Sequence, residues 1–153
     1  MTSNDYNELQ KLRAVIEQLG YTAELLSKSD ELPVDMLSIH LENDAKDRPQ
    51  FLTLAIYPLG DELDASNFVQ FYFQYPFEIR AENRIQTLET LVGVNQELPL
   101  GHFNISTDEN RVYFKYVLAL AHNQQIESIF LNDVLDMCIY TQEHYLQRLE
   151  AFA

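Results

Sequence analysis

The sequence has little of several things that specialised proteins need. Its 153 residues contain one cysteine, Cys138, no tryptophan and only four glycines. A single cysteine cannot form an internal disulfide, and no basic-then-apolar start of a secretory signal is visible, so we expect a reducing, cytoplasmic location. Neither a P-loop nor a dinucleotide-binding fingerprint occurs. No run approaches the roughly 18 apolar residues of a membrane span, so we expect no membrane partner.

Basic residues are also scarce. The chain has 10 Lys and Arg against 24 Asp and Glu, which gives a formal net charge of −14. A surface this negative repels nucleic-acid phosphates and anionic lipid heads, so we expect no nucleic-acid partner. It would favour a basic protein or peptide, although acidity for solubility alone is the commoner reason for such a charge. The sequence leaves both explanations open.

Apolar and aromatic residues, by contrast, are abundant. Hydrophobic residues make up 46% of the chain, which includes nine Tyr and nine Phe. This composition predicts a folded globular protein rather than a disordered one. Neither an internal repeat nor a linker interrupts the chain, and its length suits one core. We therefore predict a single domain over residues 1–153.

Three segments carry apolar residues at helical spacing. In residues 4–20, Ser3, Asn4 or Asp5 can cap the start, and Gly20 can end the helix in a left-handed conformation. The other two helices are expected over residues 81–98 and 123–152. In the former, an apolar face is expected from Ile85, Leu88, Leu91, Val92 and Leu98. The latter is apolar on more than one side, so it could pack on the sheet and also contact a partner. Its apolar residues are Ile126, Ile129, Phe130, Leu131, Val134, Leu135, Met137, Cys138 and Ile139.

Six further segments alternate apolar and polar residues or are dense in aromatic residues, and both patterns are typical of strands. They are residues 21–29, 35–43, 50–59, 68–79, 101–107 and 111–120. Short connections join the first four, as in an antiparallel meander. The predicted fold class is therefore α+β, an antiparallel sheet with helices packed on one face, in the order α-β-β-β-β-α-β-β-α.

The stretch LETLVGVNQELPLGHFNISTDENRVYFKYVLAL resembles the YbjN-like family, whose fold is shared with type III secretion chaperones. The similar features are an acidic turn before a strand and, ahead of it, five positions: Leu91, Asn95, Leu98, Gly101 and Phe103. The order of elements is similar over nearly the whole chain. The family usually has a glycine in the hairpin turn, where this sequence has Asn110, and asparagine tolerates a positive φ better than other non-glycine residues.

The resemblance implies a function as well as a fold. Type III secretion chaperones are small acidic cytoplasmic dimers that bind a segment of another protein and perform no catalysis. YbjN-like proteins are associated with regulatory or stress-related roles. The family provides neither a catalytic residue nor a cofactor to transfer to this chain.

The residues that could carry chemistry form no recognised motif. His40, His102, His122 and His144 are not paired at zinc-ligand spacing with one another or with Cys138. The cysteine falls on an apolar helical stripe, which favours a buried thiol over an activated nucleophile. No G-x-S-x-G motif occurs. We therefore expect a protein that is not an enzyme, with no catalytic residue, metal or cofactor.

Two acidic clusters resemble metal sites at first sight. Asp61, Glu62 and Asp64 lack the alternating oxygen ligands, central glycine and distal glutamate of a calcium loop, so they predict a solvated connection. The second cluster is the Asp-Glu-Asn tip at residues 108–110, between two apolar strands. Aspartate and asparagine favour chain reversal, so we predict an exposed hairpin turn without metal.

The aromatic run of the fourth strand is the feature that most favours binding. Strand alternation places Phe71, Phe73 and Tyr75 on one face of the sheet and Phe68 and Tyr72 on the other. One face would pack under helices, and the other would be a large apolar surface unless a homodimer partner or a peptide covers it. These five residues form the candidate protein-binding site, and ordinary two-sided packing is the open alternative.

Two functions of different class follow from these features. The first is a non-catalytic protein-binding module, chaperone-like or regulatory, that acts through a homodimer or a peptide-binding surface. The alternative is a small-molecule sensor or an unrecognised hydrolase. Its site would lie between sheet and helices and would use His40, His102 and nearby carboxylates.

Overall fold

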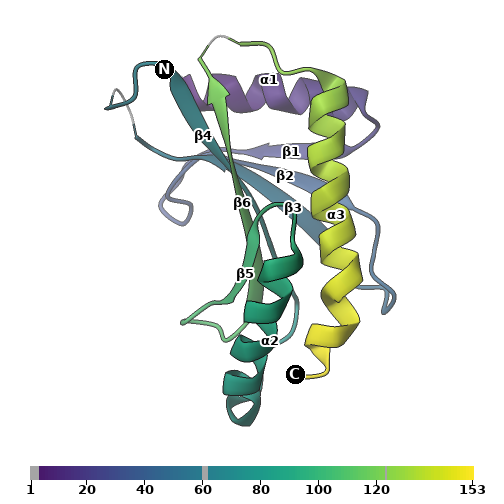
Figure 1. Cartoon of the computed structure of the whole chain (residues 1–153). Helices are drawn as coiled ribbons and strands as arrows, with labels where there is room; N and C mark the ends of the chain where they lie inside the picture. The colour runs from purple at the N-terminus through teal and green to yellow at the C-terminus, as the bar shows by residue number, and fades with distance from the viewer. Residues whose placement is uncertain (1–3, 60–61, 123) are drawn as a thin grey trace. The chain divides into compact units, whose positions relative to one another are not determined.

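The computed structural model describes residues 4–59, 62–122 and 124–153. It confirms the α+β fold class and the predicted order of elements, with a six-stranded antiparallel sheet and three helices in the described residues (Figure 1). None of these helices combines the length and the apolar character that a membrane span requires. The elements are α1 Asn4–Gln18, β1 Thr22–Leu26, β2 Met36–Leu41, β3 Gln50–Ile56, β4 Ser66–Gln74, η2 Ala81–Asn83, α2 Arg84–Glu97, β5 His102–Ile105, β6 Val112–Ala121 and α3 Ser128–Glu150.

The strand order in the sheet is β1-β2-β3-β4-β6-β5, so β1 and β5 are its edge strands. The chain divides into two compact units. Unit 1 comprises residues 1–71 and 117–136, and unit 2 comprises residues 72–116 and 137–153. No linker separates the units, because β4, β6 and α3 each contribute residues to both.

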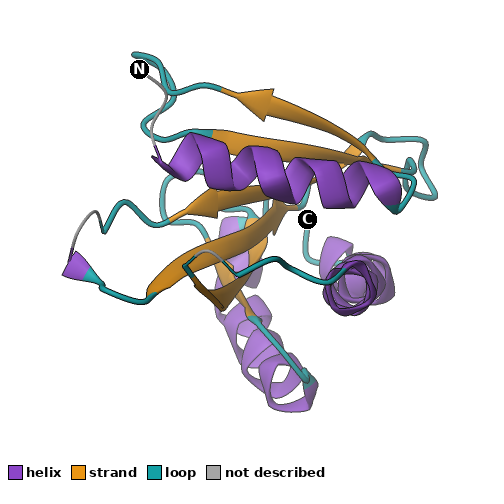
Figure 2. Ribbon diagram, turned by 90° about the horizontal axis from the view of Figure 1, so that it is seen from above, coloured by secondary structure: helices purple, strands orange, loops and turns teal. Residues whose placement is uncertain are grey.

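In unit 1, helix α1 packs on one face of β1–β3 (Figure 2). Its buried residues Leu9, Leu12 and Ile16 lie at helical spacing, as predicted. Gly20 has a φ of +96° and ends the helix, because its N–H donates to the carbonyl oxygen of Glu17 while the next N–H reaches back to Ile16. The predicted left-handed C-cap is confirmed. Ser3, one of the predicted N-cap residues, lies outside the described residues.

The strands of unit 1 bury alternate side chains on one face of the sheet, as their sequence pattern predicts. The register pairs Ala23 with Ile39 and Leu37 with Leu54. The buried members are Ala23, Leu37, Ile39, Leu52, Leu54, Ile56, Val69 and Phe71. The side chains between them point to the opposite side of the strands, which we call the outer face of unit 1.

Unit 2 has an aromatic core. The rings of Phe73 and Phe114 stack with centroids 4.9 Å apart, and Phe103 meets Phe114 edge to face at 5.5 Å. Such pairs each contribute about 0.5–1.5 kcal/mol beyond their buried area. The hydroxyl of Tyr75 donates a hydrogen bond of 2.7 Å to the backbone oxygen of Gln142 on α3, which satisfies the one polar group of that buried ring.

The predicted buried face of α2 is wrong in part. Leu91 is buried as expected, together with Thr87 and Val94. The other apolar residues of this helix point to solvent, with exposed fractions of 73% for Ile85, 37% for Leu88 and 62% for Val92. Periodicity could not choose between the two sides, because apolar residues occupy both. We call the exposed set Ile85, Leu88 and Val92 the α2 stripe.

The apolar residues of α3 divide between two sides of the helix. Leu131, Val134, Leu135 and Cys138 are buried, whereas Ile129 and Phe130 at its beginning are exposed. The buried side also includes the polar residues Thr141 and Gln142, which the apolar pattern alone could not reveal. The hydroxyl of Thr141 donates to the backbone oxygen of Met137, so its burial leaves no donor unpaired.

Candidate protein-binding surfaces

The five aromatic residues of the candidate binding site divide between the core and the surface. Phe71, Phe73 and Tyr75 are buried, whereas Phe68 and Tyr72 are half-buried. The alternation predicted for this strand is therefore confirmed. The assignment of all five to one binding surface needs correction, because the three buried side chains belong to the core and offer a partner no surface in the folded chain.

Tyr72 lies in unit 2, where its own neighbours cover it. Its ring stacks on Tyr113 with centroids 5.5 Å apart, and its hydroxyl donates to the side-chain oxygen of Gln74. Gln74 in turn donates to a carboxylate oxygen of Glu109 at 2.6 Å. Desolvation by burial, followed by the nearby Tyr113 and Glu109, raises the pKa of Tyr72 above 10. The hydroxyl is therefore a neutral hydrogen-bonding group.

Phe68 lies in unit 1, on an outer face that is largely apolar at one end. Leu26 of β1 pairs with Met36 of β2, and the register of the next strand pair places Ala55 beside Met36. The side chain of Val117 on β6 points to the same face. Exposed fractions reach 36% for Leu26 and 37% for Val117. We call the set Leu26, Met36, Ala55, Phe68 and Val117 the outer patch.

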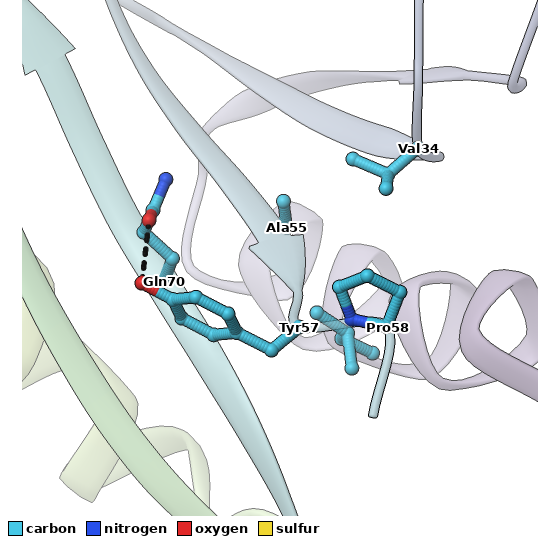
Figure 3. Close-up of a pocket in the computed structure, with 6 residues that line it drawn as sticks. Val34, Ala55, Tyr57, Pro58 and Gln70 are labelled. Carbon is cyan, nitrogen blue, oxygen red and sulfur yellow. Dashed lines mark hydrogen bonds between the residues drawn. The ribbon is translucent and has the colours of Figure 1, made fainter. Parts of the chain in front are cut away.

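A hollow of about 140 Å³ opens beside the outer patch. Its lining is mainly apolar and includes Val34, Ala55 and Pro58. Figure 3 shows the ring of Tyr57 reaching toward Gln70 of β4, where the Tyr57 hydroxyl donates to the Gln70 side-chain oxygen at 2.9 Å. The hydroxyl of Tyr57 is thus satisfied within the lining, which leaves the hollow suited to an apolar group.

Sequence reasoning missed this hollow. Strand parity placed Phe68 on the outer face, and the same parity applied to β2 and β3 would have placed Met36 and Ala55 there. Val34 and Pro58 lie outside the strands. The sequence gives no sign that they lie close together, because their approach depends on how the segments before β2 and after β3 fold.

The two edge strands differ in how their backbones are covered. At β5, the side chain of Asn95 on α2 donates to the Phe103 carbonyl oxygen at 3.0 Å and accepts from the Phe103 N–H at 2.7 Å. It thereby takes the place of a neighbouring strand. In the described part of the chain, no side chain makes such a pair of bonds with the backbone of β1.

Charge is distributed unequally between the two units. By sequence, unit 1 carries 16 of the 24 acidic and 5 of the 10 basic residues, a net charge of −11. Unit 2 carries the remaining 8 acidic and 5 basic residues, a net charge of −3. Attraction of a basic partner would therefore act mainly on unit 1.

The histidines do not converge on one site. His40 and His102 are both exposed, the former 4.0 Å from a Glu24 oxygen, so neither occupies the sheet–helix interior of its unit. His122 lies 3.0 Å from the Asn67 side-chain oxygen, and His144 stacks on Tyr140. In residues 4–59, 62–122 and 124–153, no three His, Cys, Asp or Glu side chains form a group that could hold a metal ion.

Cys138 has the structural role predicted for it. The side chain is buried on α3 in unit 2, and desolvation raises the pKa of its thiol to about 12. A thiol with so high a pKa stays protonated at neutral pH, so it is a poor nucleophile and a poor metal ligand.

The acidic tip is a turn that is tied to its surroundings. Asn110 has a φ of +53° and donates its N–H to the Ser106 oxygen, which confirms the predicted reversal. Its side-chain oxygen accepts a hydrogen bond of 2.9 Å from Arg84 at the start of α2. In the other acidic cluster, Asp61 lies outside the described residues, and Glu62 and Asp64 belong to the connection before β4.

The positions that carry the family resemblance have structural roles in unit 2. Leu91 and Phe103 are buried, and Asn95 covers the edge of β5. Gly101 has a φ of +70°, and a side chain there would meet Phe114 at 2.4 Å. Sequence comparison adds no further support, since neither a protein-family model nor a curated protein gave a significant match to the chain.

Proposed function

We propose that the chain is a non-catalytic protein-binding module, chaperone-like or regulatory, that works as a homodimer. The observation that carries this proposal is the α2 stripe, an apolar helix surface that no other part of the described chain covers. Contiguous exposed apolar surface is the usual mark of a protein interface. The resemblance to the YbjN-like family and to type III secretion chaperones points to the same function.

Three features of unit 2 favour a second copy as the cover of the α2 stripe. Ile85, Leu88 and Val92 follow one another at helical spacing, so they can face the same residues of an identical helix across a twofold axis. Gly93 lies beside them, and a side chain at that position would meet nothing within 4 Å, so a helix can approach closely there. The net charge of −3 opposes the approach of two copies far less than the −11 of unit 1 would.

Light scattering on the purified chain tests this proposal. We expect a mass twice the 17.9 kDa of one chain. Ile85→Glu should yield a folded monomer, because two carboxylates would be buried at the interface. Gln86→Glu adds the same charge at the neighbouring exposed position outside the stripe and should remain dimeric. A monomeric wild-type chain, or a dimer that survives Ile85→Glu, would contradict a homodimer built on this helix.

The alternative of a small-molecule sensor or hydrolase has weaker support. Ligand pockets usually measure about 300–1,000 Å³, whereas the hollow on unit 1 measures about 140 Å³ and has a mainly apolar lining. The histidines expected to serve such a site, His40 and His102, lie at exposed positions. We therefore prefer the binding module.

A further inference from the structure

We infer that the outer patch of unit 1 binds a basic, extended segment of a partner protein, which inserts one apolar side chain into the hollow beside Ala55. This inference rests on the proposed protein-binding function and adds a place and a partner chemistry to it. The surface lies on unit 1, whereas the α2 stripe lies on unit 2, so the two can be tested separately.

The hollow has the size and polarity of a pocket for one side chain. Its 140 Å³ is close to the roughly 150 Å³ of a cavity that stays dry and holds benzene. Such a volume suits a leucine, methionine or phenylalanine side chain. The hydroxyl of Tyr57 is bonded to Gln70, so an entering apolar group does not deprive it of its hydrogen bond.

The outer patch continues this apolar surface across the strands. From Ala55 at the hollow, the register leads to Met36 on β2 and then to Leu26 on β1. A segment that lies across this row covers several half-exposed apolar side chains in addition to its anchor. The required occupant is therefore longer than a single small molecule.

The negative charge of unit 1 favours a basic segment as the partner of the outer patch. With a net charge of −11, this unit repels a second copy of itself and attracts a basic chain. A carboxylate also lies close to the apolar row. Glu24 precedes Leu26 by two residues on the same face of β1. A lysine or arginine side chain next to the apolar anchor would lie near this acid.

A labelled synthetic peptide of alternating lysine and leucine is the probe, and fluorescence anisotropy with the full chain is the measurement. We expect binding that weakens as salt is added, because the attraction is electrostatic. A peptide with glutamate in place of lysine and one with serine in place of leucine should both fail to bind. Equal binding of the glutamate peptide would overturn the inference, and so would binding that ignores the loss of leucine.

Two variants of the chain locate the binding. Ala55→Phe fills the hollow with a side chain on an accessible strand face and should weaken binding about tenfold or more. His102→Phe adds the same ring at an exposed position of β5 in unit 2 and should leave binding unchanged. Equal affinity of Ala55→Phe and His102→Phe, both folded by circular dichroism, would contradict the assignment of the hollow.

The other occupants give distinct outcomes. If Ala55→Phe dissociates a dimer without affecting the peptide, a second copy covers the outer patch, and the inference is wrong. It is equally wrong if the hollow binds benzene but no peptide. If the peptide fails to bind while Ile85→Glu still dissociates a wild-type dimer, the inference fails and the proposed function stands. If the wild-type chain is a monomer and binds the peptide, the inference stands and the proposed homodimer is wrong.

Discussion

On unit 2, side chains of the sheet surface stack on or hydrogen-bond to one another, whereas the outer face of unit 1 carries an apolar patch and a hollow. In unit 2, Tyr72 stacks on Tyr113, Gln74 bonds to Glu109, and Asn95 covers the edge of β5. In unit 1, the corresponding face carries the outer patch and the hollow, and β1 is an edge strand. The sheet surface of unit 2 is therefore covered by its own side-chain contacts, whereas that of unit 1 offers an apolar surface to a partner.

The difference indicates where stability and binding are concentrated. Backbone-covering side chains and a stacked aromatic core rigidify unit 2, and they leave few groups for a partner apart from the α2 stripe. The outer patch of unit 1, by contrast, is an exposed apolar surface on a unit with a net charge of −11. We therefore expect substitutions in unit 2 outside the α2 stripe to change mainly the stability of the fold, and substitutions on the outer patch of unit 1 to change peptide binding.

Alanine substitution of two glycines should show this contrast most strongly. Both Gly101 of unit 2 and Gly20 of unit 1 have a positive φ, but only at Gly101 would a side chain clash, 2.4 Å from the Phe114 ring. Gly101→Ala should lower the free energy of unfolding by about 3 kcal/mol or more, from overpacking and backbone strain together. Gly20→Ala meets open space and should cost about 1 kcal/mol. Urea denaturation measures both losses. Equal losses would mean that the aromatic core of unit 2 accommodates the added methyl group at little cost.

Removal of the side chain that covers β5 should have the next largest effect. Asn95→Ala leaves the Phe103 N–H and carbonyl without their partner, so we expect a loss of about 2 kcal/mol and faster hydrogen exchange along β5. Asn132→Ala removes one exposed bond to Asp136 and should cost no more than about 0.5 kcal/mol. Unchanged protection of β5 in Asn95→Ala would show that the edge is closed by other means.

The loop between β2 and β3 of unit 1 contains a carboxylate that accepts several hydrogen bonds. The Asp44 side chain is only 2% exposed and accepts hydrogen bonds from the backbone N–H groups of Arg48 and Lys46 and from the Arg48 guanidinium. Desolvation is the largest influence and would raise the pKa of Asp44, but these donors together hold it below its ordinary value of 3.8.

A lowered pKa in the folded state means that the carboxylate stabilises the fold at neutral pH. This contribution is complete above pH 3.8 and is lost as the pH falls through the lowered pKa. Asp44→Asn should therefore cost about 1 kcal/mol at neutral pH and progressively less in acid. Thermal unfolding of both proteins between neutral pH and pH 3 measures the difference, and a gap that widens in acid would refute the role of the carboxylate.

The smallest effect is expected at the hairpin tip of unit 2. Asn110→Gly relieves the positive φ but removes the bond from Arg84, so the two changes should cancel within about 0.5 kcal/mol. Asn110→Ala loses the bond and keeps the strain, and it should cost about 1 kcal/mol. If alanine proves as stable as glycine in urea denaturation, the φ at this position carries no cost.

The sequence predicted the local structure better than the surfaces. Helical spacing and Gly20 located α1 and its end, strand alternation divided the aromatic residues of β4 correctly, and the acidic tip was recognised as a turn. For helices with apolar residues on two sides, spacing alone does not show which side is buried, because burial there depends on tertiary packing. Ile85 and Phe130 are examples. The hollow depends on Val34 and Pro58, which meet only in the folded chain.

We expect a basic segment to bind the outer patch of unit 1 and not the sheet surface of unit 2 near β5, Tyr72 and Tyr113. An NMR titration of the isotope-labelled full chain with the lysine–leucine peptide tests it at the level of single residues. We expect the largest shifts of backbone amide signals on the outer patch and around the hollow, near Ala55 and Gln70, with little change at β5. Shifts concentrated on β5 or at Tyr72 and Tyr113 would contradict it.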